Sequence, residues 1–402
     1  MRTLLWPVLA LYIASCGRID YDPSAVTDGG AAIDARPDAT LITPVDAAPD
    51  AFNGDPDTLW WDRAWSHRVR LTIDTNDLGE DLFNIPVAVY LDATRIDAAK
   101  VRADGADVRF VGPDNKTVLE HEIDTWPELE LSVVGDAAVI WVMVPELKAA
   151  AGKSHFWLYY GNAVAQPAQR PEKVWSSGYV GVWHLDQPAD PRLDVTGNGN
   201  ALSARGSIES IAGRLGDGVV LSSKIDGLPL LREVIDPGAN DTSGLTVEAW
   251  ILPASSEEIM VIAAKSDYDG GRSFELYRLA DETIELALSF DCSNAVTAHS
   301  PSRTGVDRWH HVAGTFDGDV MRIYHNGVLT AEEPVNLSAG YTPCANDAPF
   351  TLGAIDDGKL PFDGVMDELR LSGHAHSGEW IRVQNRATND DLITYGAQEA
   401  QF

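Results

Sequence analysis

Two acidic residues in the segment VLEHEIDTWPELE, residues 118–130, have the spacing that glycoside hydrolysis requires. Glu122 and Asp124 lie two positions apart, so on a β-strand their side chains point to the same face of the sheet. Two carboxylates on one face can serve as a general acid and as a nucleophile or base toward a glycosidic bond. The segment is therefore the first candidate for a catalytic site.

The rest of this segment argues against catalysis. It resembles the E-x-D-x-x-E strand of laminarinases and lichenases, which are jelly-roll enzymes that hydrolyse β-glucans. The third carboxylate of that motif would fall at Pro127, and the nearest glutamate is Glu128, one residue late. Pro127 also lacks the amide donor that a sheet ladder uses. We therefore expect an ordinary strand here and no catalytic residue.

Acidic residues strongly outnumber basic ones in this chain. The 402 residues include 61 Asp and Glu against 30 Lys and Arg, which gives a formal net charge of -31. A surface of this sign repels the phosphates of nucleic acids. No nucleic-acid partner is expected.

The N-terminal segment MRTLLWPVLALYIASC resembles a bacterial lipoprotein signal. Its apolar run is too short to span a membrane, and small residues precede Cys16 as in a lipobox. The resemblance implies removal of residues 1–15, lipidation of Cys16 and anchoring to the outer membrane or cell surface. An ordinary signal peptide is the alternative. Residues 16–58, rich in Ala, Asp and Pro, predict a disordered acidic tether that reaches the membrane only through the lipid.

Short alternating segments from residue 59 onward predict antiparallel strands. In HRVRLTIDT, for example, Val69, Leu71 and Ile73 share one face. The segments WWDRAWSHRVRLTI, ADGADVRFV, EIDTW, VIWVMVP and FWLYYGNAVA resemble, in this order, an uncharacterised bacterial domain of secreted and surface proteins. The resemblance implies a β-sandwich over residues 59–172, in a family with no established activity.

A second set of strand patterns follows, with Asn326-Gly327 as a strong hairpin signal. The segments VGVWHLD, DVTGNGNALS, LTVEAWI, WHHVAGTFDGDVMRIYHNGV, FTLGA and FDGVMDELRL resemble the laminin-G-like members of the concanavalin A-like jelly rolls. The resemblance implies a second sandwich over residues 178–397 that binds carbohydrates or proteins. The expected fold class is all-β, with two antiparallel β-sandwich (jelly-roll) domains in tandem.

A structural calcium ion is the cofactor that the sequence favours. Asp194, Asn198 and Asn200 lie in the glycine-rich segment LDVTGNGN, and Asp367 lies in a late strand. Calcium prefers clustered oxygen ligands of this kind, and the resemblance implies that the first and last strands of the jelly roll are neighbours. The alternative is that Asp194 and the glycines simply form a tight turn.

Cys292 and Cys344 are the only cysteines that remain once Cys16 is lipidated. Both lie in polar, turn-like stretches without a basic neighbour that would activate a thiol. An exported protein meets an oxidising compartment, where an even pair of cysteines forms a disulfide. We therefore predict a Cys292–Cys344 bridge, which requires the two loops to meet at one rim of the second sandwich.

Two functions of different classes fit these features. The leading interpretation is a non-catalytic binding or adhesion lipoprotein whose ligand is a carbohydrate or an extracellular matrix protein. The alternative is a secreted polysaccharide-degrading hydrolase with a jelly-roll site. Aromatic strand residues could supply a sugar platform, but such residues more often belong to the core. The aromatic residues considered are Trp250, Tyr268, Tyr277 and Tyr324.

Overall fold

The computed structural model describes residues 59–127, 137–205, 208–222, 231–233 (backbone only), 244–256, 258–267, 271–335, 342–355 and 358–401. The expected signal segment, the lipidation site Cys16 and the tether over residues 16–58 lie outside these ranges. In the described part of the chain, no helix combines the length and the apolar character needed to cross a membrane.

The first sandwich is built from two antiparallel sheets. Its strands are β1 (His67–Asp74), β2 (Leu82–Leu91), β3 (Arg109–Val111), β4 (Val118–Leu119), β5 (His121–Thr125), β6 (Ala138–Leu147), β7 (Lys153–Tyr160) and β23 (Ile393–Ala400). One sheet has the order β23-β1-β7-β3-β4, and the other has the order β2-β6-β5. The alternation predicted for β1 is confirmed, because Val69, Leu71 and Ile73 are all buried in the core between the sheets.

The second sandwich also has two antiparallel sheets. Its strands are β8 (Tyr179–Trp183), β9 (Ser203–Ala204), β10 (Glu209–Ala212), β11 (Asp217–Leu221), β12 (Leu231–Glu233), β13 (Leu245–Pro253), β14 (Met260–Asp267), β15 (Gly271–Arg278), β16 (Ile284–Ser289), β17 (Ala295–Ser300), β18 (His310–Phe316), β19 (Val320–His325), β20 (Val328–Pro334), β21 (Phe350–Leu352) and β22 (Gly364–Ser372). In the described residues, an eight-stranded sheet has the order β10-β11-β22-β13-β18-β19-β20, with β8 also paired to β22. A seven-stranded sheet has the order β17-β16-β15-β14-β21-β12-β9.

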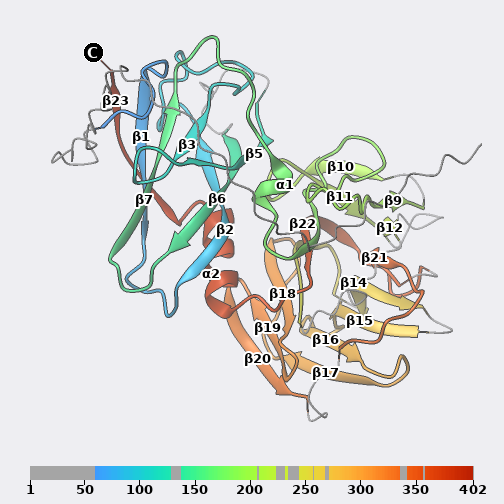
Figure 1. Ribbon diagram of the computed structural model, residues 1–402. Coiled ribbons are helices and arrows are strands. Elements are labelled where there is room, and N and C mark those ends of the chain that lie inside the picture. The colour runs from blue at the N-terminus through green and yellow to red at the C-terminus, as the bar shows by residue number, and fades with distance from the viewer. Residues whose placement is uncertain are drawn as a thin grey trace, which may run out of the picture. The chain divides into compact units, whose positions relative to one another are not determined.

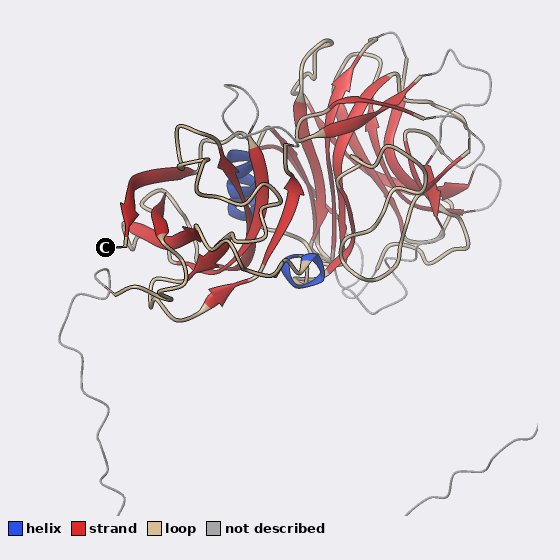
Figure 2. Cartoon of the chain, turned by 90° about the horizontal axis from the view of Figure 1, so that it is seen from above, coloured by secondary structure: helices blue, strands red, loops and turns tan. Residues whose placement is uncertain are grey.

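The expected all-β fold class with two antiparallel sandwiches is confirmed. Strands dominate the described residues, and the helices are α1 (Pro171–Val174) and α2 (Gly378–Thr388) (Figure 2). The hairpin predicted between β19 and β20 is also present. Asn326 and Gly327 both have positive φ, at 50° and 76°, which is the backbone conformation that favours Asn-Gly in a tight turn.

The C-terminal segment returns to the first sandwich. After β22 the chain forms α2, and β23 then pairs with β1 along the edge of the first sheet (Figure 1). Trp380, Ile381 and Val383 of α2 are buried in the same apolar core as β1 and β2. The second sandwich is therefore inserted in the chain between β7 and β23. The domain expected over residues 178–397 includes α2 and most of β23, which the structure places with the first sandwich. Chain order suggested the boundary at residue 397, whereas the pairing of β23 with β1 assigns this strand to the first sandwich.

Both faces of the central strands β13 and β22 are buried. Every residue of β22 is buried, and eight of the nine residues of β13 are buried as well. One face of these strands carries Val247, Ala249 and Leu371, which pack in the core of the second sandwich. The opposite face carries polar and charged residues that the first sandwich and its connections cover. This covered polar face holds the candidate site described next.

Candidate functional site

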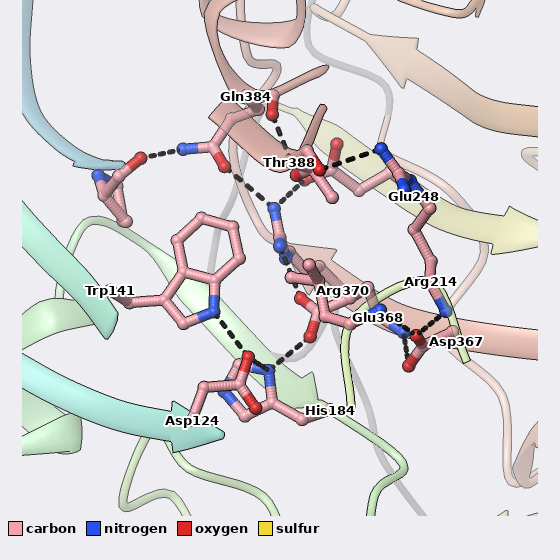
Figure 3. A network of polar contacts seen from close by, with 12 residues as sticks. Asp124, Trp141, His184, Arg214, Glu248, Asp367, Glu368, Arg370, Gln384 and Thr388 are labelled. Atoms are coloured by element: carbon pink, nitrogen blue, oxygen red, sulfur yellow. Dashed lines mark hydrogen bonds and ion pairs between the residues drawn. The ribbon is translucent and has the colours of Figure 1, made fainter. Parts of the chain in front are cut away.

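A buried network of charged side chains joins the two sandwiches (Figure 3). Asp124 comes from β5 of the first sandwich, His184 follows β8, and Glu368 lies in β22. His184 Nδ1 lies 2.6 Å from Glu368 Oε1 and 3.7 Å from Asp124 Oδ2. The second ring nitrogen, Nε2, lies 3.3 Å from Glu122 Oε2. The His184 ring is thus surrounded by three carboxylates, two from one sandwich and one from the other.

Backbone irregularities direct these side chains toward one another. The pairing of β5 with β6 shifts register between Ile123 and Thr125, next to Asp124. The pairing of β13 with β22 shifts register between Glu248 and Trp250, and Glu368 lies in the bulge with a φ of 52°. A bulge changes the direction of a side chain relative to the regular pleat. A non-glycine residue at such a φ persists only where its surroundings hold it in place.

Arg370 provides positive charge at the centre of the network. Its guanidinium lies 2.5 Å from Glu368 Oε2 and also donates a hydrogen bond of 2.8 Å to Gln384 Oε1 in α2. The guanidinium carbon lies 4.5 Å from the ring centre of Trp141 and 4.9 Å from that of Trp175, which are cation–π distances. Arg370 therefore contacts both sandwiches and the helix that returns the chain to the first one.

Burial and mutual charge shift the pKa values in this network. Burial raises the pKa of Asp124 to about 7, with the nearby carboxylates of Glu368 and Glu122 adding to the effect and His184 opposing it. Burial alone would raise the pKa of Glu368, but His184 and Arg370 hold it at about 2. Burial opposes a proton on His184, yet the carboxylates of Asp124, Glu368 and Glu122 raise its pKa well above the usual value. The network thus favours a positive charge at the His184 position.

This network is closed to large ligands. The exposed fractions of the side chains of Glu122, Asp124, His184 and Glu368 are between 0% and 5%. None of these residues lines any of the three cavities described below. A polysaccharide cannot reach the pair of carboxylates that the sequence first suggested as catalytic. The sequence pointed to Glu122 and Asp124 but not to their partners His184 and Glu368. The signal for these partners was a charged or titratable residue within the strand segments VGVWHLD and VMDELRL.

The structure places the residues predicted to bind calcium in two separate hydrogen-bonded settings. Asp194 accepts hydrogen bonds from the backbone N–H groups of Val182, at 3.2 Å, and of Asn200, at 3.0 Å. The side-chain amides of Asn198 and Asn200 donate to the carbonyl of Val180, so the loop is bound to β8. These contacts are those of an ordered turn, and the calcium site stays a prediction.

Asp367, the fourth residue of that set, makes its contacts elsewhere. Its Oδ2 atom accepts hydrogen bonds from the backbone N–H groups of Arg214, at 2.7 Å, and Leu215, at 2.8 Å. Its Oδ1 atom accepts from the N–H of Glu368 at 2.8 Å. Burial, reinforced by the charge of Glu368, raises the pKa of Asp367 well above its usual value. Both oxygen atoms of this carboxylate are already hydrogen-bonded to the backbone.

A groove on the outer face of the seven-stranded sheet is the candidate ligand site. Two cavities, of about 400 Å³ and 220 Å³, adjoin there and share four lining residues. Those shared residues are Arg272, Glu275, Tyr277 and Leu360. On β15, Phe274 and Leu276 point into the core, so Glu275 and Tyr277 point to the opposite face. The groove combines an aromatic ring with charged groups on a rigid sheet.

The charged side chains that line the groove lie next to one another on β15 and β16. Arg272 Nε lies 2.8 Å from Glu275 Oε2, with the arginine side chain 38% exposed. Glu285 of β16 is in register with Tyr277. Burial raises the pKa of Glu285, with His299 opposing and Glu275 adding to the shift. Burial, reinforced by Glu275, also raises the pKa of Tyr277, so its hydroxyl remains a hydrogen-bond donor at neutral pH.

The predicted disulfide is present at this groove. Cys292 and Cys344 are bonded, with Cα atoms 5.2 Å apart. Cys292 also lines the larger cavity, and the N–H of Cys344 donates a hydrogen bond of 2.7 Å to the carbonyl of Ser289 at the end of β16. The predicted bridge therefore joins two loops of the second sandwich, and Cys292 places it beside the groove.

The aromatic candidates from the sequence divide between core and groove. Trp250 and Tyr324 are 4% and 3% exposed and lie away from both cavities of the groove. Tyr277, at 8% exposed, lines both of them. Tyr268 lies outside the described residues. A third cavity, of about 550 Å³, lies in the first sandwich and is lined partly by Leu119 and Phe156.

Two segments of the chain match known families. Residues 233–382 match the family described as the Concanavalin A-like lectin/glucanases superfamily. This matched segment runs from the end of β12 into α2. Residues 104–196, which precede it, match a Domain of unknown function (DUF2341). Among curated proteins, none matches the sequence significantly.

Three solved structures, all of them binding domains, show a distant likeness to this chain. The binding domain of Paraclostridial Mosquitocidal Protein 1 has a TM-score of 0.42 and 12% identity, with 52% of each chain covered. The binding domain of Botulinum Neurotoxin DC in complex with SialylT has a TM-score of 0.43 and 11% identity, covering 53% of this chain and 52% of the other. The receptor binding domain of botulinum neurotoxin D has a TM-score of 0.42 and 15% identity, with 52% of each chain covered. This chain thus spans about half the length of these structures, and the likeness carries no argument about function.

Proposed function

We propose that this protein binds a carbohydrate through the groove on the seven-stranded sheet and does not hydrolyse it. The observation that carries the proposal is the position of Tyr277 between the charged side chains of Glu275, Arg272 and Glu285. An aromatic ring gives a sugar an apolar surface for stacking, and neighbouring charged groups accept or donate hydrogen bonds to its hydroxyls. The match to a superfamily of lectins and glucanases supports a carbohydrate as the ligand class.

Glycan binding by the full-length chain should depend on Arg272. Arg272→Ala removes a partly exposed donor from the groove, together with the ion-pair partner of Glu275, so the affinity for a glycan found on an array is expected to fall about tenfold, equivalent to about 1.4 kcal/mol. Titration of that glycan into the wild type and the variant measures the effect. Tyr277→Ala should weaken binding further, because it removes the aromatic surface.

Arg322→Ala is the matched control for this experiment. Arg322 is also a strand arginine in an ion pair, with Asp317, but it lies on β19 of the eight-stranded sheet. Its removal should leave glycan affinity unchanged. Equal losses in Arg272→Ala and Arg322→Ala would contradict the placement of the ligand in the groove, as would full binding by Tyr277→Ala.

Hydrolysis is the second candidate function, and Glu285 favours it. Its pKa is raised, as a general acid requires, while Glu275 is paired with the Arg272 guanidinium as a charged carboxylate would be. Release of reducing sugar from a polysaccharide panel, abolished by Glu285→Gln, would replace the binding proposal with this one. Binding that persists in Glu285→Gln without any sugar release by the wild type supports the binding proposal.

Membrane anchoring through Cys16 is a further part of the proposed function. The supporting feature is the apolar segment that ends in Ile13-Ala14-Ser15-Cys16. Cys16→Ser removes the thiol that would carry the lipid, so the protein should move from the membrane fraction to the soluble fraction of the producing cells. A variant that remains in the membrane fraction after a high-salt wash would contradict anchoring through this cysteine.

A further inference from the structure

We propose that Asp124, His184 and Glu368 form a binding site for one divalent transition-metal ion at the junction of the two sandwiches. Each of the three residues offers one ligand atom, and these atoms lie within 4.8 Å of one another. Asp124 comes from the first sandwich, whereas His184 and Glu368 come from the second. An ion at this position would therefore connect the two sandwiches directly.

The second oxygen atom of each carboxylate ligand is bound by another residue. Trp141 Nε1 donates a hydrogen bond of 3.0 Å to Asp124 Oδ2. Arg370 lies 2.5 Å from Glu368 Oε2, which leaves Oε1 facing His184. Outer partners of this type orient the ligands of metal ions in proteins. The Glu122 carboxylate, 3.3 Å from His184 Nε2, corresponds to the acid that commonly orients a metal-binding histidine.

One oxygen atom of this set has no partner in the described structure. Asp124 Oδ1 makes no hydrogen bond, although the Asp124 side chain is 0% exposed. A buried carboxylate oxygen without a partner costs free energy, because it has lost its hydrogen bonds to water. A metal ion between Asp124 and His184 would satisfy this atom.

The charges also favour a divalent ion. When Asp124 is ionised as a metal ligand, the carboxylates of Glu122, Asp124 and Glu368 supply three negative charges, and Arg370 supplies one positive charge beside them. A divalent ion bound by a neutral His184 balances the remaining two charges. The other buried acids nearby have their own partners. Glu248 pairs with His311 at 3.1 Å, and Asp367 accepts hydrogen bonds from three backbone N–H groups.

The ligand types indicate which ion would bind. One imidazole nitrogen with two carboxylates suits zinc and similar first-row metals, whereas calcium takes oxygen ligands only. The set also shares no residue with the predicted calcium ligands Asp194 and Asp367, so the two predictions can be tested separately. Zn²⁺ is the probe for the site proposed here.

Zinc binding by the full-length chain tests this proposal. After removal of metal with a chelator, calorimetric titration with Zn²⁺ should show one tight equivalent, and that equivalent should remain after gel filtration. Asp124→Asn and His184→Gln should each weaken binding at least about 100-fold, and Glu122→Gln, which changes only the outer partner, roughly 10- to 100-fold. Asp194→Asn is the control and should bind as the wild type does.

Three outcomes would overturn the proposal. The first is a wild-type protein that retains no zinc, which would leave a protonated His184 together with Arg370 as the positive partners of the carboxylates. The second is equal retention by the wild type and Asp124→Asn, which would place the ion at one of the other histidines. The third is an unchanged affinity for zinc in Glu122→Gln. This variant keeps a hydrogen-bond acceptor at position 122, so it still tests the proposal if the ligand variants fail to fold.

Discussion

A chain that ends at Ser372 is expected to lose the folded first sandwich. The deletion removes α2 and β23, which follow the second sandwich in the chain but pack on and pair with the first. The buried side chains of Trp380, Ile381 and Val383 alone contribute about 5 kcal/mol or more through apolar burial. A domain is typically stable by only about 5–15 kcal/mol, so this loss approaches the whole stability of the sandwich.

Specific polar contacts would be lost in the same deletion. Gln398 accepts a hydrogen bond of 2.6 Å from the hydroxyl of Tyr160, and Glu399 lies 2.7 Å from the Arg68 guanidinium. The deletion would also make β1, which remains paired to β7, the exposed edge strand of its sheet, and such an edge is prone to aggregation. The structure therefore predicts that residues 59–172 alone, without the C-terminal segment, form an incomplete sandwich.

Urea unfolding and limited proteolysis can measure this effect. The truncated chain should be cleaved rapidly within residues 59–172 in the absence of denaturant, whereas the full-length chain should resist. Deletion of residues 1–53, which lie outside the described residues, is the control and should leave the urea midpoint unchanged. If truncation at Ser372 left the midpoint and the cleavage pattern unaltered, β23 would not be part of the first sandwich.

Arg370→Met is expected to have the largest effect of any single substitution in the network. The side chain of Arg370 is 3% exposed and pairs with Glu368, and Glu248 Oε1 lies 3.9 Å away. Removal of one member of a buried ion pair leaves an uncompensated charge, which typically costs about 3–5 kcal/mol. The variant also loses the cation–π contacts with Trp141 and Trp175 across the junction.

The free energy of unfolding of the metal-free protein, measured in urea, tests this prediction. Arg322→Met is the matched control, because Arg322 forms an ion pair with Asp317 in which the two side chains are 25% and 36% exposed. Exposed pairs contribute about 0–1 kcal/mol, so this control should differ little from the wild type. Similar losses of free energy of unfolding in the two variants would contradict the prediction that a buried ion pair is more costly to break than an exposed one.

The sequence by itself was sufficient for the local features of this protein. Alternating apolar residues predicted strands such as β1, and Asn326-Gly327 predicted the β19–β20 hairpin. These features depend on neighbours within a few residues, where the period of a strand and the allowed φ of a turn apply directly. The prediction of a bridge between Cys292 and Cys344 followed from the number of cysteines, since only one pairing remains if Cys16 is assigned to lipidation.

Only the tertiary structure decided how the polar residues of the strands are used. A period of two shows that alternate side chains share a face, but it does not show what covers that face. The charged residues Glu248, Glu368 and Arg370 have the pattern of a solvent-exposed face, yet the first sandwich buries them beside Asp124 and His184. Residues far apart in the chain meet there because β5 of the first sandwich and β22 of the second lie close together. The same long-range packing places β23 beside β1, a pairing that no local pattern in its sequence specifies.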